Sequence, residues 1–246
     1  MSYGVFAQYY DALTENVDYP AKAEYIRTLL ERHKPGCALV VDLACGTGNL
    51  SLELASLGYD MIAVDGSPDM LMAASAKENP GVMFLCQQMD ELDLYGTVDA
   101  VVCTLDSVNH VTDADVLQEA FRRVSLFLEP DGVFLFDANT PYKHRCVLGE
   151  NVYVYDLDEV YCVWQNRPLE NDCTEICLDF FEPDEDGAYY RSSESFTERA
   201  YSRDQLADML DKAGMVILEE YDDYTEAAPS ELTQRVVYVC GKKGAK

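Results

Sequence analysis

The stretch Val40-Val41-Asp42-Leu43-Ala44-Cys45-Gly46-Thr47-Gly48 decides the fold of this chain. A short apolar run contains a carboxylate near its end, and two glycines follow one residue apart. Glycine adopts left-handed backbone conformations at little cost and lets a ligand approach the main chain closely. The pattern therefore predicts a buried parallel strand, a tight turn and the first residues of a helix.

A second landmark is Val64-Asp65, which comes 19 residues after Gly46. An apolar strand that ends in a carboxylate at this distance is the usual place to hold a ribose diol. The two motifs together predict a nucleoside-containing cofactor at the carboxyl edge of a parallel sheet. The dinucleotide fingerprint G-x-G-x-x-G is incomplete, because Ser51 replaces its third glycine. Asp42 also suits a cationic ligand better than a pyrophosphate, so dinucleotide binding is kept only as an alternative.

Residues 42–50, D-L-A-C-G-T-G-N-L, resemble motif I of the class I S-adenosylmethionine-dependent methyltransferases. Further segments are similar to the family's motifs in the same order: Asp65 to its ribose-binding acid, Met89-Asp90 to its adenine-contacting pair, and residues 99–111 to its fourth strand and the following loop. Each motif alone is explained equally well by a turn or a helix cap, but their joint order is specific. Within the family, the chain most resembles the bacterial small-molecule branch that includes amino-sugar N-methyltransferases.

The resemblance implies cofactor contacts at the ends of the predicted strands and in the N-terminal segment. These contacts are Tyr9, Tyr19, Asp42, Ala44, Cys45, Gly46, Gly48, Asp65, Gly66, Met70, Met89, Asp90, Leu105 and Asp106. Asp42 would order the glycine loop or reach the cofactor's amino group, Asp65 would bind the ribose hydroxyls, and Asp90 would bind the adenine amine. Met89 would pack on the adenine ring, with ordinary core packing as its alternative. The implied cofactor is S-adenosylmethionine, and its product is S-adenosylhomocysteine.

The loop Leu105-Asp106-Ser107-Val108-Asn109-His110 contains the main catalytic candidate. It follows a central strand of an open sheet, at the edge where ligands bind. It resembles the S-x-G-H loop in which amino-sugar N-methyltransferases carry a histidine base, although Asn109 replaces the glycine. The unperturbed pKa of imidazole suits proton transfer near neutral pH. We therefore predict His110 as the base, with capping of the next helix as the alternative.

The N-terminal segment is rich in aromatic residues, beginning with Tyr3. Residues 6–13, F-A-Q-Y-Y-D-A-L, resemble the leading segment of small-molecule methyltransferases, which folds over the cofactor. A tyrosine there can bind the acceptor, so Tyr10 is predicted as a second catalytic residue. The alternative is that Tyr9, Tyr10 and Tyr19 only pack the first helix.

Basic residues cluster at one place in this acidic chain, where Lys143-His144-Arg145 follow the fifth predicted strand. Arg191 and Arg199 lie in the region that comes next. Clustered bases at the mouth of a site attract anionic substrates. We therefore expect an anionic acceptor as one option, with pairing to surface acids as the alternative. The predicted acceptor-binding residues are Asn109, Tyr142, Lys143, Arg145 and Arg191.

Apolar runs alternate with amphipathic segments through the first half of the chain. Strands are expected at residues 39–43, 61–64, 82–86, 100–103 and 133–136, and helices at residues 20–33, 50–57, 67–74 and 114–128. This alternation predicts an α/β fold with a doubly wound, Rossmann-like parallel sheet. A helix at residues 203–213 and strands at residues 215–220 and 235–240 complete a seven-stranded methyltransferase sheet.

Between residues 141 and 199 the helical period disappears, and tyrosines and β-branched residues alternate with acids. Strands are expected at residues 152–155, 160–165, 174–181 and 189–197, separated by turn signals. We predict a small antiparallel β insertion, residues 141–199, that forms an acceptor-binding lid. Residues 1–140 and 200–246 would form the cofactor-binding core, and the tail at residues 241–246 is expected to be disordered.

Composition limits the classes of partner. The formal net charge of −27, from 45 acidic and 18 basic residues, disfavours nucleic acid and anionic membrane surfaces. No secretory signal or membrane span is expected. Nine cysteines without a C-x-x-C pair and only three histidines predict a reduced, cytoplasmic protein without a metal site.

These observations predict a methyltransferase that moves a methyl group to N or O of a small molecule by in-line displacement, as a monomer or homodimer. An RNA or protein methyltransferase and a non-catalytic S-adenosylmethionine binder are the alternatives.

Overall fold

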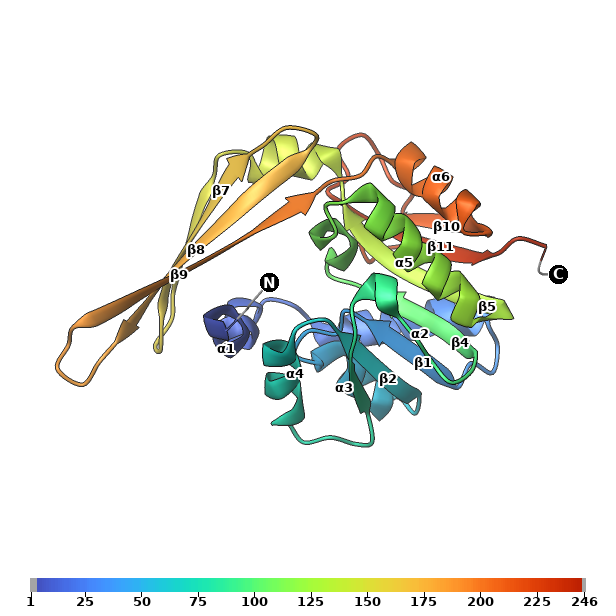
Figure 1. Cartoon of the computed structure of the whole chain (residues 1–246), viewed down its shortest axis with the longest axis horizontal. Coiled ribbons are helices and arrows are strands. Elements are labelled where there is room, and N and C mark those ends of the chain that lie inside the picture. Colours follow the sequence, from blue (N-terminus) through green and yellow to red (C-terminus); the bar gives the residue numbers. More distant parts are fainter. Residues whose placement is uncertain (1–3, 245–246) are drawn as a thin grey trace.

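The computed structural model describes residues 4–244, and its main sheet has the strand order β10-β11-β5-β4-β1-β2-β3 (Figure 1). The strands are β1 (Leu39–Leu43), β2 (Asp60–Asp65), β3 (Met83–Cys86), β4 (Val98–Cys103), β5 (Leu128–Asn139), β10 (Met215–Asp222) and β11 (Arg235–Lys242). The first five are mutually parallel, whereas β11 runs antiparallel to both of its neighbours. The predicted seven-stranded, doubly wound sheet is confirmed.

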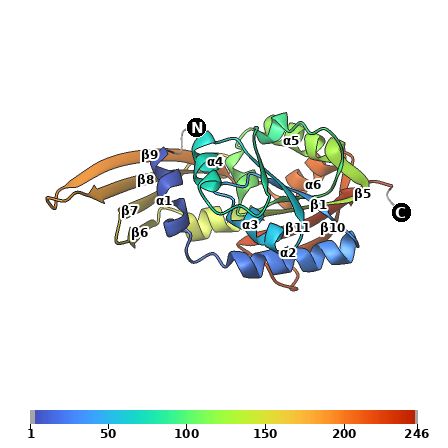
Figure 2. The ribbon, with the colours of Figure 1, turned by 90° about the horizontal axis from the view of Figure 1, so that it is seen from below.

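Helices cover both faces of the main sheet (Figure 2). They are α2 (Tyr19–His33), α3 (Asn49–Ser56), α4 (Pro68–Ser75), α5 (Ala114–Phe127) and α6 (Arg203–Lys212). Successive residues of a strand point to opposite faces, so Val40 packs with α2 and α3 while Val41 packs with α5 and α6. Both valines are completely buried. This two-sided core explains why the central strands are continuous apolar runs.

A second, antiparallel sheet follows β5 and has the order β6-β7-β8-β9. Its strands are β6 (Val152–Asp156), β7 (Tyr161–Pro168), β8 (Cys173–Pro183) and β9 (Tyr189–Arg199). Figure 1 shows this sheet extending away from the main sheet, with helix α1 (Gly4–Leu13) beside it. Ile176, Leu178 and Phe180 alternate along β8 and are fully buried, which gives the sheet an apolar face.

Helix α1 fills that apolar face. Phe6 and Tyr9 are buried in one cluster with the β8 and β9 side chains. The rings of Phe6 and Phe196 lie 5.8 Å apart, and those of Tyr9 and Phe180 lie 6.1 Å apart. The N-terminal segment therefore joins the second sheet to the main body, because α1 also contacts α4.

Three expectations about secondary structure need correction. Strand β5 begins at Leu128, directly after α5, and residues 129–132 form an irregularity in its pairing with β4. A short π-helix, Lys143–Leu148, precedes the second sheet where only strands were expected. The disorder expected from residue 241 onward is wrong for Gly241 and Lys242, which belong to β11 and pair with β10. Tyr3, Ala245 and Lys246 lie outside the described residues.

None of the helices described between residues 4 and 244 is long and apolar enough to cross a membrane.

Candidate active site

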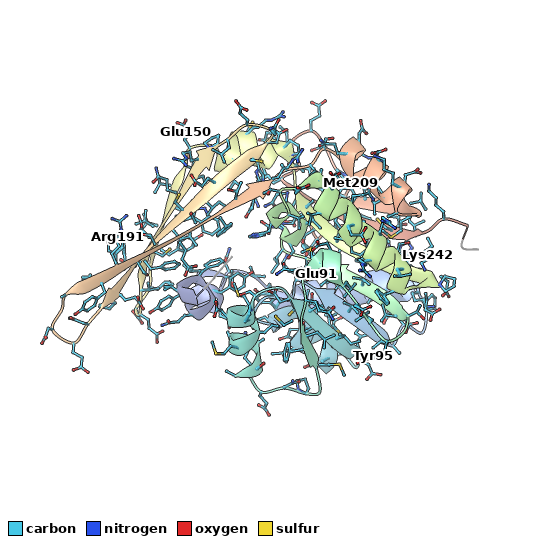
Figure 3. All side chains as sticks on the ribbon, viewed as in Figure 1. Glu91, Tyr95, Glu150, Arg191, Met209 and Lys242 are labelled. Carbon is cyan, nitrogen blue, oxygen red and sulfur yellow. The ribbon has the colours of Figure 1, made fainter. Side chains whose placement is uncertain are left out.

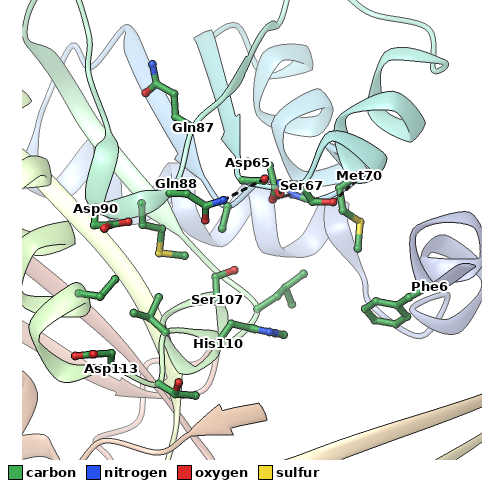
Figure 4. Close-up of a pocket in the computed structure, with 18 of the residues that line it drawn as sticks. Phe6, Asp65, Ser67, Met70, Gln87, Gln88, Asp90, Ser107, His110 and Asp113 are labelled. Atoms are coloured by element: carbon green, nitrogen blue, oxygen red, sulfur yellow. Dashed lines mark hydrogen bonds between the residues drawn. The ribbon is translucent and has the colours of Figure 1, made fainter. Parts of the chain in front are cut away.

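A cavity of about 370 Å³ opens at the carboxyl edge of the main sheet (Figure 4). Open α/β sheets bind ligands at this edge, where the helical connections diverge. Ten of the predicted residues line the main cavity: Tyr10, Ala44, Gly46, Asp65, Gly66, Met70, Met89, Asp90, Leu105 and His110. A recess of about 30 Å³ continues from it and adds Tyr19, Asp42 and Cys45. The fold thus brings together residues spread over a hundred positions of sequence.

The glycine loop presents bare backbone to this cavity. Gly46 has a φ of +55°, and a Cβ placed there would meet nothing within 4 Å. A ligand can therefore lie directly against the main chain at this point. Gly48 has a different role, since its φ is +77° and an added Cβ would come within 3.2 Å of the Phe84 ring. It was expected to contact the cofactor, but it lines neither cavity and is needed for packing.

Asp65 ends β2 and ties the glycine loop to the next helix. Its carboxylate accepts hydrogen bonds from the Gly46 N–H and the Ser67 N–H, both at 2.8 Å. Burial raises the pKa of Asp65, and the two backbone hydrogen bonds oppose that rise. Each carboxylate oxygen can accept a second hydrogen bond, so the group retains the capacity to bind a diol.

Asp42 lies at the floor of the recess. Its side chain is 2% exposed and accepts a hydrogen bond from the Ser51 hydroxyl of α3. Burial raises the pKa of Asp42 to about 7, and the hydroxyl of Ser51 opposes this. A cationic group entering the recess would favour the ionised form, because an opposite charge nearby stabilises a buried carboxylate.

The turn after β4 is held by a buried acid that the sequence analysis missed. Leu105 and Asp106 both have a φ of +56°, a left-handed conformation that side chains disfavour. The Asp137 carboxylate accepts hydrogen bonds from both backbone N–H groups, at 2.8 and 2.6 Å. Tyr224 and Arg235 also donate to Asp137. The sequence feature that could have indicated this role is the carboxylate of Asp137 within the apolar run of residues 133–138.

The Asp106 side chain was expected to contact the cofactor, but it lines neither cavity. It accepts hydrogen bonds from Arg235 at 3.0 Å and from the Asn139 amide at 2.5 Å. Burial opposes its ionisation, yet the charges of Arg235 and Lys143 outweigh burial and hold the pKa of Asp106 well below its usual range. Asp106 therefore belongs to a buried ion network behind the turn.

His110 lines the main cavity at the end of this turn and points into it (Figure 4). Its ring stacks on Phe196 of β9, with 5.0 Å between the ring centroids. Its Nε2 lies 3.6 Å from Glu198 Oε1. Burial lowers the pKa of His110, and the charges of Asp106 and Asp65 oppose that effect. The lowered pKa favours the neutral imidazole, which is the form that can accept a proton.

Several predicted residues lie away from the cavity because other groups hold their side chains. The Tyr9 hydroxyl donates to Glu182 on β8. Asn109 is fully buried and bonds the backbone of Asn139 and Arg199, so it joins β5 to β9 and is not free for an acceptor.

The basic residues expected to bind the acceptor are also engaged elsewhere. Arg145 pairs with Asp172, and Arg191 pairs with Asp179 on the second sheet, away from the main sheet (Figure 3). Lys143 donates to Asn139 at 2.8 Å. Tyr142 immediately precedes the π-helix and lines neither cavity.

Asp11 of α1 connects this helix to the glycine loop. Its carboxylate accepts hydrogen bonds from Thr47 Oγ1 at 2.6 Å and Asn49 Nδ2 at 2.9 Å, and it pairs with Lys77 Nζ at 2.6 Å. Lys77 also donates to the Thr47 carbonyl. Helix α1, which carries the cavity residues Phe6 and Tyr10, is therefore fixed over the nucleoside site by one carboxylate.

Replacing Asp11 with alanine should accelerate cofactor dissociation by about 10-fold, because charge-assisted hydrogen bonds that hold α1 closed contribute about 1.5 kcal/mol. Stopped-flow fluorescence with S-adenosylmethionine measures this rate. Asp18→Ala, which removes the N-cap of α2, is the matched control. An unchanged dissociation rate in the Asp11 variant would show that this connection does not retain the cofactor.

The fold and the cavity together define a Rossmann-like protein that binds a nucleoside cofactor at the carboxyl edge of its main sheet. The methyltransferase domain family matches residues 40–132. A protein of Geobacillus sp. (strain WCH70), named as a candidate methyltransferase, is 32% identical over 98% of this chain and 100% of its own length. The crystal structure of an S-adenosylmethionine-dependent methyltransferase from Clostridium acetobutylicum ATCC 824 is 33% identical, with a TM-score of 0.86 over 98% of this chain and 99% of that chain.

The chain therefore belongs to the S-adenosylmethionine-dependent methyltransferases, and S-adenosylmethionine is its cofactor. The open space at Gly46 and the acids Asp65 and Asp90 in the lining of the cavity fit that molecule. A dTDP-3-amino-3,6-dideoxy-alpha-D-glucopyranose N,N-dimethyltransferase of Streptomyces fradiae is 30% identical over 54% of this chain and 53% of its own length.

Proposed function

We propose that this methyltransferase acts on an amine nitrogen of a small molecule that enters between the main cavity and the second sheet. The observation that carries the proposal is His110, a partly buried imidazole at the cavity wall whose pKa is lowered. An amine is mostly protonated near neutral pH and must lose a proton before it can attack a methyl group. When bound, S-adenosylmethionine supplies a methyl group activated by its positive sulfur.

The second sheet, with the segment before it, is the acceptor-binding lid in this proposal. Phe196 of β9 stacks on His110, and Phe6 of α1 lines the cavity. These rings would cover the acceptor and exclude water from the reacting groups. The expected anionic acceptor has little support, since Arg145 and Arg191 are paired with acids. The net charge of −27 argues against RNA, whose binding depends on basic residues.

The test uses S-adenosylmethionine labelled in its methyl group, incubated with the enzyme and a cytoplasmic extract that is then separated by size. All nine cysteines are free thiols, which supports the choice of a cytoplasmic source. We expect the label in small molecules. Because both an amine acceptor and its methylated product are cations, a cation-exchange column should retain the acceptor activity before the reaction and the labelled product after it. Label in RNA or protein, or in small molecules without an amine, would refute the proposal.

His110→Ala should lower kcat by about 100-fold, because general base catalysis contributes at least that factor. The dissociation constant for S-adenosylmethionine should change less than about twofold, since the imidazole acts on the acceptor. Calorimetric titration and methyl-transfer kinetics measure the two quantities. His33→Ala is the matched control, because His33 pairs with Glu219 outside the cavity. Lost affinity with kcat retained would instead assign His110 to cofactor binding.

A further inference from the structure

Glu198 is a buried acid for which cofactor binding gives no reason. It lies on β9 with 3% of its surface exposed. Its Oε1 is 3.6 Å from His110 Nε2, and its Oε2 is 3.6 Å from His144 Nε2. A carboxylate enclosed in this way is costly unless other groups compensate for its desolvation. The position between two imidazoles suggests that the group exchanges protons with them.

The charged and titratable groups around Glu198 come from four other parts of the fold. Asp106 and His110 belong to the turn after β4, Lys143 and His144 to the π-helix, Asn139 to β5 and Arg235 to β11. Burial has the largest influence on the pKa of Glu198 and raises it, and the charge of Asp106 raises it further. The charges of Lys143 and Arg235 and a hydrogen bond from Asn139 lower it. The net result raises the pKa of Glu198 to about 8.

The pKa values of the two neighbouring histidines are lowered, whereas that of Glu198 is raised. Burial lowers the pKa of His110, and burial lowers that of His144 to about 4. His144 Nδ1 lies 3.1 Å from the Thr174 hydroxyl, which fixes its ring. No group of three or more metal-type ligands is arranged to hold an ion anywhere in residues 4–244. Glu198 and the two imidazoles are three titratable groups placed side by side.

We infer that Glu198 is the positioning residue for His110 and, in its ionised form, the group that takes over the proton released by the acceptor. The inference rests on the proposed function. The acceptor nitrogen first loses a proton to His110 Nε2, and His110 becomes neutral again by passing that proton to Oε1 of the ionised Glu198 carboxylate. The neutral nitrogen then attacks the methyl carbon. The carbon–sulfur bond breaks, and its electron pair stays on sulfur, which leaves a methylated ammonium and a neutral thioether.

Strand β9 orients the base as well as taking its proton. Phe196 contacts the face of the His110 ring, and Glu198, two residues further along the same strand, contacts its edge. Side chains two residues apart in a strand lie on one face of the sheet. The second sheet therefore supplies both contacts that fix the imidazole.

The first test is histidine-selective NMR on the wild-type protein across the pH range, without an acceptor. The chain has three histidines, so variants of His33 and His144 assign every signal. We expect the His110 signal to show an inflection near pH 8, where Glu198 ionises, while the His33 signal shows none. Absence of the His110 inflection would overturn the inference, and this measurement needs no Glu198 variant to fold.

The second test is Glu198→Gln, which keeps the shape of the side chain and removes its ionisation. We expect the His110 inflection to disappear and kcat, measured above pH 8 where wild-type Glu198 is ionised, to fall about 100-fold, with the KM for S-adenosylmethionine unchanged. Glycine and glucosamine are the acceptors used. Glu185→Gln, on an exposed turn of the second sheet, is the matched control. A purely structural role would lower stability and leave kcat of the folded variant unchanged, which would overturn the inference.

The outcomes separate this inference from the proposed function. If the inflection depends on Glu198 but neither amines nor the extract fractions that contain them are methylated, the proposed function fails and so does the proton transfer from an acceptor. If amines are methylated and Glu198→Gln has full activity, the proposed function stands and the inference about Glu198 fails.

Discussion

Asp65→Asn should weaken S-adenosylmethionine binding by about 100-fold. The carboxylate is placed to accept hydrogen bonds from a ribose diol while it holds the N–H groups of Gly46 and Ser67. Hydrogen bonds to a charged group contribute about 1.5 to 3 kcal/mol each, and about 3 kcal/mol corresponds to about 100-fold in affinity. Isothermal titration calorimetry measures the change directly.

The matched control is Asp60→Asn, at the exposed opposite end of the same strand. It makes the same chemical change, so its affinity for S-adenosylmethionine should equal that of the wild type. Because burial raises the pKa of Asp65, wild-type affinity should also decline in acid at a higher pH than an exposed aspartate would give. Equal affinities for the two variants would remove Asp65 from the cofactor site.

The cofactor half of the site was predictable because it depends on local sequence. Gly46, Asp65 and Asp90 each follow a short apolar strand, and parallel strands bring their carboxyl ends to one edge of a sheet. The hydrophobic alternation fixed the number and direction of those strands. Placing these residues at one edge of the sheet therefore needed no knowledge of distant contacts, and most of the predicted strand ends line the cavity.

The acceptor half was not predictable, because distant partners decide where its side chains point. Nothing local to Arg145 indicates that Asp172 will pair with it, and nothing near Arg191 singles out Asp179. In a chain with 45 acids and 18 bases, an exposed arginine readily finds a carboxylate. Glu198 was missed for the same reason, since its partners are 88 and 54 residues away along the chain.

Asp137→Ala should destabilise the protein by about 3 to 5 kcal/mol, the typical result of removing one partner of a buried ion pair. Asp137 is completely buried and receives hydrogen bonds from two backbone N–H groups, Tyr224 and Arg235. Its loss would leave these donors without their acceptor and release the left-handed turn at residues 105–106. Urea denaturation followed by circular dichroism measures the free energy of unfolding.

Asp131→Ala is the matched control on the same strand, because Asp131 forms an exposed ion pair with Lys34. Exposed pairs contribute little, so this variant should unfold almost as the wild type does. The charge pairing can be tested with the single variants Asp137→Asn and Arg235→Gln and the double variant that combines them. If paired charge stabilises the protein, the double variant should lose less unfolding free energy than the two single variants lose together. Additive losses would show that the two groups act independently. Methyl transfer should fall in every variant that frees the turn, because His110 is positioned by the same backbone that Asp137 holds.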